Sequence, residues 1–326
     1  MKPVSLLIFY FIFSMPVKGI IVAGANGGAD STNNTTQQQL EMLPGVSDGH
    51  FFQNVFRMGA GNGVFLGFRN TESGAVGYAL SGMHLGNISS VTIQSLTYTA
   101  TRTAIDGSDL ALYRLTRNDN VMPSLQTIQL ANAPINNNTP VIMIGEGRNR
   151  VQNSTLDANT PDSISLSSGG EGYTTTSTRL MRWGTNDSSD FPRITGPGGV
   201  PASSVRTFDI GGRDTVVFRT VFDQPTSGDW LTTNQAQAVT NDSGGGVFGL
   251  DGSLLGIMVA VQAPSANEAQ FGNTTLIADI ATYRNAIEAE IGGVLIPEPG
   301  TLILLGLTGL AAVLGFWGRG RQAERL

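Results

Sequence analysis

One serine of the chain stands in a setting that favours chemistry. The segment TNDSGGGVFG, residues 240–249, places Ser243 between an acidic residue and three consecutive glycines. Glycines tolerate backbone conformations that other residues avoid, so the segment predicts a tight turn. A flexible linker is a weaker interpretation, because an apolar strand pattern begins at Val247. We therefore expect a Ser243 hydroxyl open to attack a substrate; the alternative is an ordinary turn without a chemical role.

A serine hydroxyl is a poor nucleophile at neutral pH, so a hydrolase needs a base and an acid that orients the base. The chain has two histidines. His84 ends the β-like run YALSGMHLGN, whereas His50 lies in a polar segment, so His84 is the better candidate base. Asp109 opens the alternating run SDLALYRL and is the better candidate acid. Asp106 is the rival, but it precedes a glycine in a predicted turn.

The composition argues against several other kinds of site. The 326 residues include no cysteine, which excludes a cysteine nucleophile, an iron–sulfur centre and thiolate ligands for zinc. Two histidines without the HExxH spacing argue against a catalytic metal, so we expect neither a metal nor a cofactor. The formal net charge of −6 leaves no basic surface for phosphates, which argues against a nucleic-acid partner.

The elements that position these residues are predicted to be short strands. The 42 glycines and the low charged fraction of 13% suit strands joined by turns better than a helical bundle. The apolar runs that predict strands cover residues 63–68, 76–80, 90–99, 110–115, 140–145, 215–222 and 253–261. A polar stretch over 146–178 separates two groups of runs, so we expect an all-β fold with two packed antiparallel halves.

One helix is predicted near the end of the folded region. Its apolar residues recur at helical spacing and form one face: Leu276, Ile280, Tyr283, Ile287 and Ile291. Gly292 and Gly293 follow this face and are typical of a helix C-terminus. We expect the helix to pack on the surface of the β domain.

The N-terminal end is predicted to lie outside the folded domain. Residues 1–25 have the pattern of a secretory signal peptide, with a cut expected after Gly19 or Ala25. An N-terminal membrane anchor is the alternative. Residues 26–54 are polar and poor in apolar side chains, which predicts a loose arm and places the start of order near Val55.

The C-terminal end has three parts. Residues 293–300 form a linker that contains PEP, residues 301–318 are apolar enough for a transmembrane helix, and residues 319–326 are an arginine-rich tail expected in the cytoplasm. Together they resemble the PEP-CTERM sorting signal of bacterial exported proteins. The resemblance implies removal of the tail at the membrane by an exosortase-type enzyme, and release to the cell surface or extracellular matrix. A plain membrane anchor is the alternative.

The segments around the three candidate residues resemble those of the trypsin/chymotrypsin-like serine peptidases. LSGMHLG is similar to the histidine segment of that family, SDLALYRL to its aspartate strand and NDSGGGVF to its nucleophile turn. The segments GVFLG, VIMIGEGRNR, RWGTN, FDQ and FGNTTLIADIATYRNAI resemble a bacterial branch with PEP-CTERM tails. The resemblance covers about residues 55–292. It implies two six-stranded β-barrels with a C-terminal helix and an active site between them.

The resemblance also implies roles for individual residues. Ser243 is the expected nucleophile, His84 the general base and then acid, and Asp109 the residue that orients His84. The backbone N–H groups of Asn241 and Ser243 are expected to form an oxyanion hole, with Asp242 supporting the turn. The implied reaction is hydrolysis of a polypeptide through an acyl-enzyme.

Four positions depart from the pattern of the family. Asn241 replaces a glycine whose backbone is left-handed, a conformation that asparagine enters more readily than most residues. Val259 stands where a serine usually supports the aspartate, and Val261 where a glycine usually admits the substrate side chain. Gln237 predicts a specificity pocket without an acidic floor, so cleavage after basic residues is not expected. The alternative function is a catalytically inactive trypsin-like module that binds at the cell surface or in the matrix.

The stretch GIIVAGANGG, which begins at Gly19, raises one further possibility. Peptidases of the resembled family often begin with Ile-Val-Gly-Gly, and the freed amine pairs with the aspartate before the serine. A cut after Gly19 or Ile20 would give a similar start, with Asp242 as the partner. The signal peptide is the competing explanation for this hydrophobic stretch.

Overall fold

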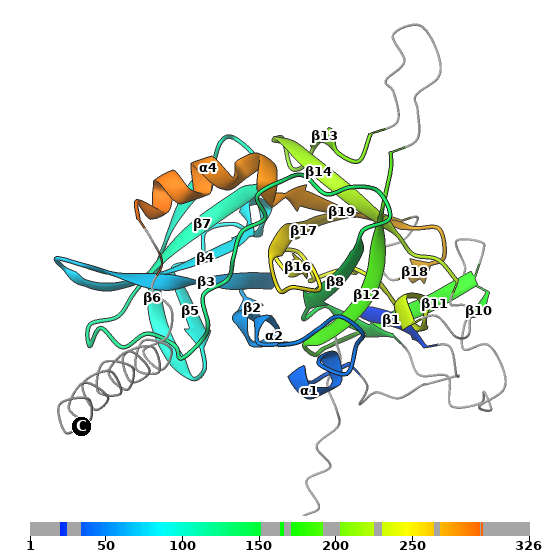
Figure 1. Ribbon diagram of the computed structural model, residues 1–326, viewed down its shortest axis with the longest axis horizontal. Helices are drawn as coiled ribbons and strands as arrows, with labels where there is room; N and C mark the ends of the chain where they lie inside the picture. Colours follow the sequence, from blue (N-terminus) through cyan, green and yellow to red (C-terminus); the bar gives the residue numbers. More distant parts are fainter. Residues whose placement is uncertain are drawn as a thin grey trace, which may run out of the picture.

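The structure is a computed structural model, and it shows an all-β molecule in which two β-barrels lie beside each other (Figure 1). It describes residues 20–24, 34–150, 164–165, 171–191, 203–224, 230–263, 268–293 and 295. The predicted signal segment before Ile20, the PEP motif, the transmembrane helix and the basic tail lie outside the described residues. Among the described residues, none of the helices has the length and apolar character that a membrane crossing requires.

The first barrel is formed by six antiparallel strands in the order β2-β3-β4-β7-β6-β5. They are β2 (Val55–Met58), β3 (Gly61–Thr71), β4 (Gly74–Gly82), β5 (Ser90–Ile93), β6 (Leu96–Ile105) and β7 (Leu110–Thr116). β2 and β5 lie in contact, so the two edges of the sheet curve towards each other. Alternation places Tyr98 and Ala100 inside and the intervening threonine Thr99 outside, as expected for a strand with one buried face.

The second barrel closes through hydrogen-bonded pairs in the ring β8-β16-β17-β19-β14-β12. Its strands are β8 (Pro140–Gly145), β12 (Arg182–Ser189), β14 (Asp214–Val221), β16 (Gly246–Phe248), β17 (Leu254–Gln262) and β19 (Thr274–Asp279). β1 (Ile21–Gly24), β15 (Asn234–Gln237) and β13 (Arg206–Asp209) extend the sheet. Its interior is filled by apolar side chains that include Met143, Phe218 and Ile277.

Both barrels follow one pairing scheme. If the six strands of each barrel are numbered 1 to 6 in chain order, their order in the sheet is 1-2-3-6-5-4 in both barrels. The fourth strand then meets the first, in contact in the first barrel and hydrogen-bonded in the second. The two halves therefore repeat a topology although the sequence shows no repeat at a fixed period. This confirms the prediction of two packed antiparallel halves.

Smaller elements complete the fold. The polar stretch expected to separate the halves contributes β9 (Arg148–Arg150), β10 (Ile164–Ser165) and β11 (Glu171–Arg179), and β11 also pairs with β18 (Glu268–Gln270). The short helices are α1 (Gln37–Leu40), α2 (Phe51–Asn54), the 3-10 helix η1 (Met83–Leu85) and α3 (Trp230–Thr233). β18 follows β17 in the chain and returns towards β11, beside the second barrel.

The predicted C-terminal helix is α4 (Ile280–Ile291), which begins four residues later than the apolar pattern indicated. Asp279 caps its N-terminus by accepting a hydrogen bond from Thr282 N at 3.0 Å, so Leu276 belongs to β19 instead. Gly292 ends the helix with a left-handed φ of 68°. α4 contacts β17 of the second barrel and β6 of the first (Figure 1), so it bridges the two barrels.

The prediction of a loose arm over residues 26–54 is wrong for residues 34–54. Leu40, Leu43, Val46 and Phe51 are buried in the core that both barrels share. The Phe51 ring lies 4.9 Å from the ring of Phe248, directly after the nucleophile turn. Four well-spaced apolar side chains anchor the segment, although its average composition is polar.

Candidate active site

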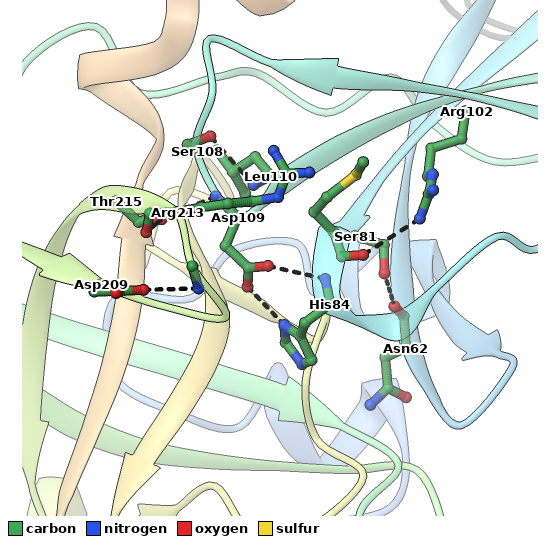
Figure 2. Close-up of polar contacts among 12 residues, drawn as sticks. Asn62, Ser81, His84, Arg102, Ser108, Asp109, Leu110, Asp209, Arg213 and Thr215 are labelled. Atoms are coloured by element: carbon green, nitrogen blue, oxygen red, sulfur yellow. Dashed lines mark hydrogen bonds and ion pairs between the residues drawn. The ribbon is translucent and has the colours of Figure 1, made fainter.

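His84 and Asp109 are brought together by the pairing of two strands in the first barrel. β4 pairs with β7 so that Gly82 lies opposite Leu110, which places the residues that follow β4 beside those that precede β7. Asp109 Oδ1 accepts a hydrogen bond from His84 N at 2.9 Å, and Oδ2 lies 2.6 Å from His84 Nδ1. Figure 2 shows both contacts. The carboxylate thus holds the backbone and the ring of the same histidine.

Burial and a hydrogen bond from its backbone hold Asp109 in place. Asp109 is fully buried, and its backbone N–H donates to Thr215 Oγ1 at 2.8 Å, across from β14 of the second barrel (Figure 2). A buried carboxylate accepts hydrogen bonds, so the proton of the neutral imidazole lies on Nδ1 and Nε2 is left as the acceptor. The His84 side chain is 29% exposed, which leaves its ring accessible. This is the protonation pattern that a general base requires.

Ser243 occupies the tight turn that the glycine-rich segment predicted. Asp242 N donates to Val239 O at 3.0 Å and Gly245 N donates to Asp242 O at 2.9 Å. Gly244 has a φ of 84°, and a Cβ there would lie 2.0 Å from Asn62 O, so glycine is required at this point. Ser243 is half-buried and lines a cavity of about 260 Å³.

Ser243 and the His84 segment approach each other at Gly61. A Cβ at Gly61 would lie 2.4 Å from Ser243 O and 2.6 Å from Leu85 Cδ1, the side chain next to His84. Among the described residues, no hydrogen bond joins Ser243 Oγ to His84. Catalytic hydrogen bonds in substrate-free proteins are often long and shorten when substrate binds. The structure therefore pairs His84 with Asp109 and places Ser243 near the residue that follows His84, without a hydrogen bond between Ser243 and His84.

Asn241 adopts the left-handed conformation that was expected, with a φ of 81°. Its side chain reaches the first barrel, where Nδ2 donates to Ala60 O at 2.7 Å. Its carbonyl accepts from Asn62 Nδ2 at 2.8 Å. In the described part of the chain, the backbone N–H groups of Asn241 and Ser243 have no acceptor. These two donors, on either side of Asp242, are free to bind an oxyanion.

Asp242 faces away from solvent and towards β8 and its following loop. Oδ2 accepts from Val239 N at 2.8 Å, while Oδ1 has no hydrogen-bond partner among the described residues. Burial raises the pKa of the Asp242 carboxyl to about 7, although the Val239 N–H, the Arg179 guanidinium and the Gly147 N–H oppose this shift. The turn is thus supported by a carboxyl group that lacks one partner.

β1 pairs the predicted N-terminal start with β15, the strand that precedes the Asp242 turn. Ile21 pairs with Gln237, and the antiparallel register carried one residue further places Ile20 opposite Ala238. Ile20 is fully buried in the core of the second barrel. Residues 20–24 are therefore part of the folded domain, which disagrees with a signal peptide that extends to residue 25.

The cavity beside Ser243 is the candidate specificity pocket. Its lining residues are Gln237, Ala238, Val239, Thr240, Ser243, Met258, Ala260, Val261, Ala263 and Glu268. Gln237 and Val261 lie where the sequence placed them. Val259 does not line the cavity: its side chain is buried in the shared core, where the pairing of β17 with β19 shifts register between Met258 and Ala260.

Glu268 is a residue of this pocket that the sequence did not reveal. It is buried, with 6% of its surface exposed, and lies on β18. The pocket thus contains a carboxyl group, although the position expected to form its floor is Gln237. Glu268 lies on a different strand from Gln237, and the pairing of β18 with β11 was not predictable from local pattern. Thr215, which contacts Asp109, was missed for the same reason, because it comes from the other barrel.

The remaining candidate residues lie elsewhere. Asp106 stands in the turn before β7 with a left-handed φ of 45°, and Asp109 is the carboxylate that contacts His84. His50 Nδ1 lies 3.1 Å from Asp48 Oδ2, at the start of α2. The described residues contain no group of three or more histidine, aspartate or glutamate side chains that could hold a metal ion.

Solved structures that resemble this chain include several proteases. The active form of the Rv3671c protease from M. tuberculosis is 17% identical with a TM-score of 0.42, and the match covers 90% of this chain and 95% of that one. A glutamic acid-specific serine protease is 12% identical with a TM-score of 0.38, covering 72% of this chain and 95% of that one. Such low values transfer no residue role to this chain.

Comparisons of sequence alone give no relative. No protein-family model matches the chain, and no curated protein matches it either.

Proposed function

We propose that the protein is a serine hydrolase that cleaves polypeptides with Ser243, His84 and Asp109. The observation that carries the proposal is the contact of 2.6 Å between His84 Nδ1 and the buried Asp109 carboxylate. It leaves Nε2 as a base, and Ser243, which lines a pocket, approaches the His84 segment at Gly61.

The proposed reaction begins when His84 Nε2 takes the proton of Ser243 Oγ and the oxygen attacks the peptide carbonyl carbon. The backbone N–H groups of Asn241 and Ser243 stabilise the oxyanion of the tetrahedral intermediate; one such donor is worth roughly 3 kcal/mol. The intermediate collapses as His84 gives its proton to the leaving amine. Water, activated by His84, then hydrolyses the acyl-enzyme and restores Ser243.

The proposal includes export and N-terminal processing. Burial of Ile20 and pairing of β1 with β15 favour a cut after Gly19 over one after Ala25, since the latter would remove β1, which extends the sheet of the second barrel. The α-amine released at Ile20 would be close to Val239, whose N–H already contacts Asp242. It could give the Asp242 carboxylate its missing partner. Tail removal by an exosortase-type enzyme, or anchoring through the helix over 301–318, remains part of the proposal by resemblance.

Proteolysis of an unstructured protein tests this function. The purified protein is incubated with a denatured, fluorescently labelled protein, and fragment release is compared with that of the Ser243→Ala variant. We expect fragments from the wild type only. Absence of fragments from a folded, N-terminally processed wild type would contradict peptidase activity and support the alternative, an inactive module that binds at the cell surface or in the matrix.

A further inference from the structure

Asn62 is a fully buried asparagine of β3 with four hydrogen bonds around the nucleophile turn. Its backbone N–H donates to Ser243 O at 2.8 Å, and its side-chain Nδ2 donates to Asn241 O at 2.8 Å. Its Oδ1 accepts from Glu146 N at 3.0 Å, and its carbonyl accepts from Ser81 Oγ at 2.5 Å. Figure 2 shows the last of these contacts. The backbone and the side-chain amide of this first-barrel residue are thus both hydrogen-bonded.

The two bonds to the turn fix peptide planes on either side of the one that carries the Ser243 N–H. The carbonyl of Asn241 belongs to the peptide before Asp242, and the carbonyl of Ser243 to the peptide after Ser243. Arg179 Nη2 adds a longer contact of 3.4 Å to Asn241 O. A rotation of the turn that moved its N–H groups out of the oxyanion hole would break these bonds and leave a buried amide unpaired, which is unfavourable.

Asn62 also connects the turn to β4, the strand that leads to His84. Ser81, which donates to Asn62 O, lies on β4 three residues before His84. The same asparagine therefore contacts the turn that carries the nucleophile and the strand that leads to the base, which come from different barrels. No local sequence pattern marks it, because GAGNG reads as a glycine-rich strand entry.

We infer that Asn62 is a positioning residue that holds the oxyanion turn, residues 241–243, in its productive conformation from across the barrel interface. The inference rests on the proposed function. It predicts a preformed oxyanion hole, since the contacts of Asn62 exist without substrate. Removal of the amide should reduce stabilisation of the transition state and leave ground-state binding of the peptide nearly unchanged.

The test compares Asn62→Ala with Asn54→Ala. Asn54 is a matched control, because it is also fully buried and its Nδ2 donates to the carbonyls of Phe65 and Gln126, both at 2.8 Å, away from the turn. We expect Asn62→Ala to lower kcat roughly 10- to 100-fold with KM changed less than about 3-fold. Affinity for a tetrahedral peptide boronate should fall by the same factor as kcat. Asn54→Ala should leave kcat and boronate affinity near the wild-type values.

A second variant, Asn62→Asp, keeps the size of the side chain and removes the donating amide, and it should show the same loss. An active wild type whose folded Asn62 variants retain kcat and boronate affinity would overturn the inference while the proposed function stands. Failure of both Asn62 variants to fold, with Asn54→Ala folded, would assign Asn62 a structural role and also overturn it. A wild type without activity would instead refute the proposed function itself.

Discussion

At the scale of single residues, the chemistry depends on how Asp109 is buried. Its two oxygens contact the backbone and the ring of His84, and its own N–H is bound by Thr215 of the other barrel. These contacts leave Nε2 as the ring nitrogen of His84 that can accept a proton. The sequence indicated the three residues that we propose to be reactive because each stands in a distinctive segment, but it did not indicate Thr215, Asn62 or Glu268. Their roles arise from contacts between residues far apart in the chain.

Asp109→Asn should lower kcat roughly 10³- to 10⁴-fold, because an amide can donate to Nδ1 and thereby favour the wrong tautomer of His84. KM should change little, since Asp109 is buried away from the pocket residues. Steady-state kinetics on a peptide substrate checks this. Asp106→Asn is the control, and an equal loss of kcat in that variant would contradict the assignment of Asp109.

Glu268 should favour substrates with a cationic side chain in the pocket, because a carboxylate in a partly buried cavity stabilises a nearby positive charge. We expect kcat/KM to be higher for lysine or arginine before the cleaved bond than for glutamine. Glu268→Gln should lower that ratio about 10-fold, which corresponds to about 1.4 kcal/mol. A ratio that the substitution leaves unchanged would show that Glu268 does not select the substrate.

At the scale of elements, the N-terminal segments are integral to the fold. Their apolar residues are few, and the low average hydrophobicity hid them from a compositional analysis. The helix α4 was predicted well because its face repeats over three turns, although its start was displaced by the Asp279 cap. Periodicity therefore located the long element, whereas short anchoring segments depend on tertiary contacts that no local pattern encodes.

Phe51→Ala should destabilise the protein by about 3–5 kcal/mol, because a fully buried ring that packs on Phe248 would be replaced by a cavity. Urea unfolding monitored by circular dichroism measures this. Met42→Ala is the control in the same segment, since Met42 is 82% exposed and should change stability by less than about 0.5 kcal/mol. Equal effects of the two substitutions would contradict the anchored arrangement of residues 34–54.

Asp242 makes the stability of the folded protein depend on pH. Its folded-state pKa is raised by burial to about 7, above the value of the unfolded chain, so the folded protein keeps a proton that the unfolded chain has released between about pH 4 and pH 7. The contribution of Asp242 therefore makes the uncut protein less stable as pH rises through this window. Urea unfolding at several pH values should show that the free energy of unfolding falls more steeply with rising pH for the uncut wild type than for uncut Asp242→Asn.

Cleavage after Gly19 should reduce that difference, because a nearby α-amine would favour the charged carboxylate and lower the Asp242 pKa. Identical pH dependence in the uncut wild type and uncut Asp242→Asn would contradict a buried, proton-holding Asp242. Identical behaviour of cut and uncut wild type would instead refute the proposed pairing with the Ile20 amine.

At the scale of the whole molecule, two barrels with one pairing scheme supply different parts of the site. The first barrel gives His84, Asp109 and Asn62, and the second gives the nucleophile turn and the pocket. Strand runs and their polar separator predicted two halves, but not how the halves meet. That interface depends on pairs such as Asn62 with Ser243 and Asp109 with Thr215, whose members are more than a hundred residues apart.

Covalent labelling of Ser243 tests the central claim most directly. The purified protein is treated with a fluorophosphonate, and the modified peptide is identified by mass spectrometry in the wild type, His84→Ala and Ser243→Ala. We expect rapid labelling of Ser243 in the wild type, labelling at least about 10²-fold slower in His84→Ala, and none at that position in Ser243→Ala. A folded wild type that stays unlabelled, or that reacts at the same rate without His84, would contradict a nucleophile activated across the two barrels.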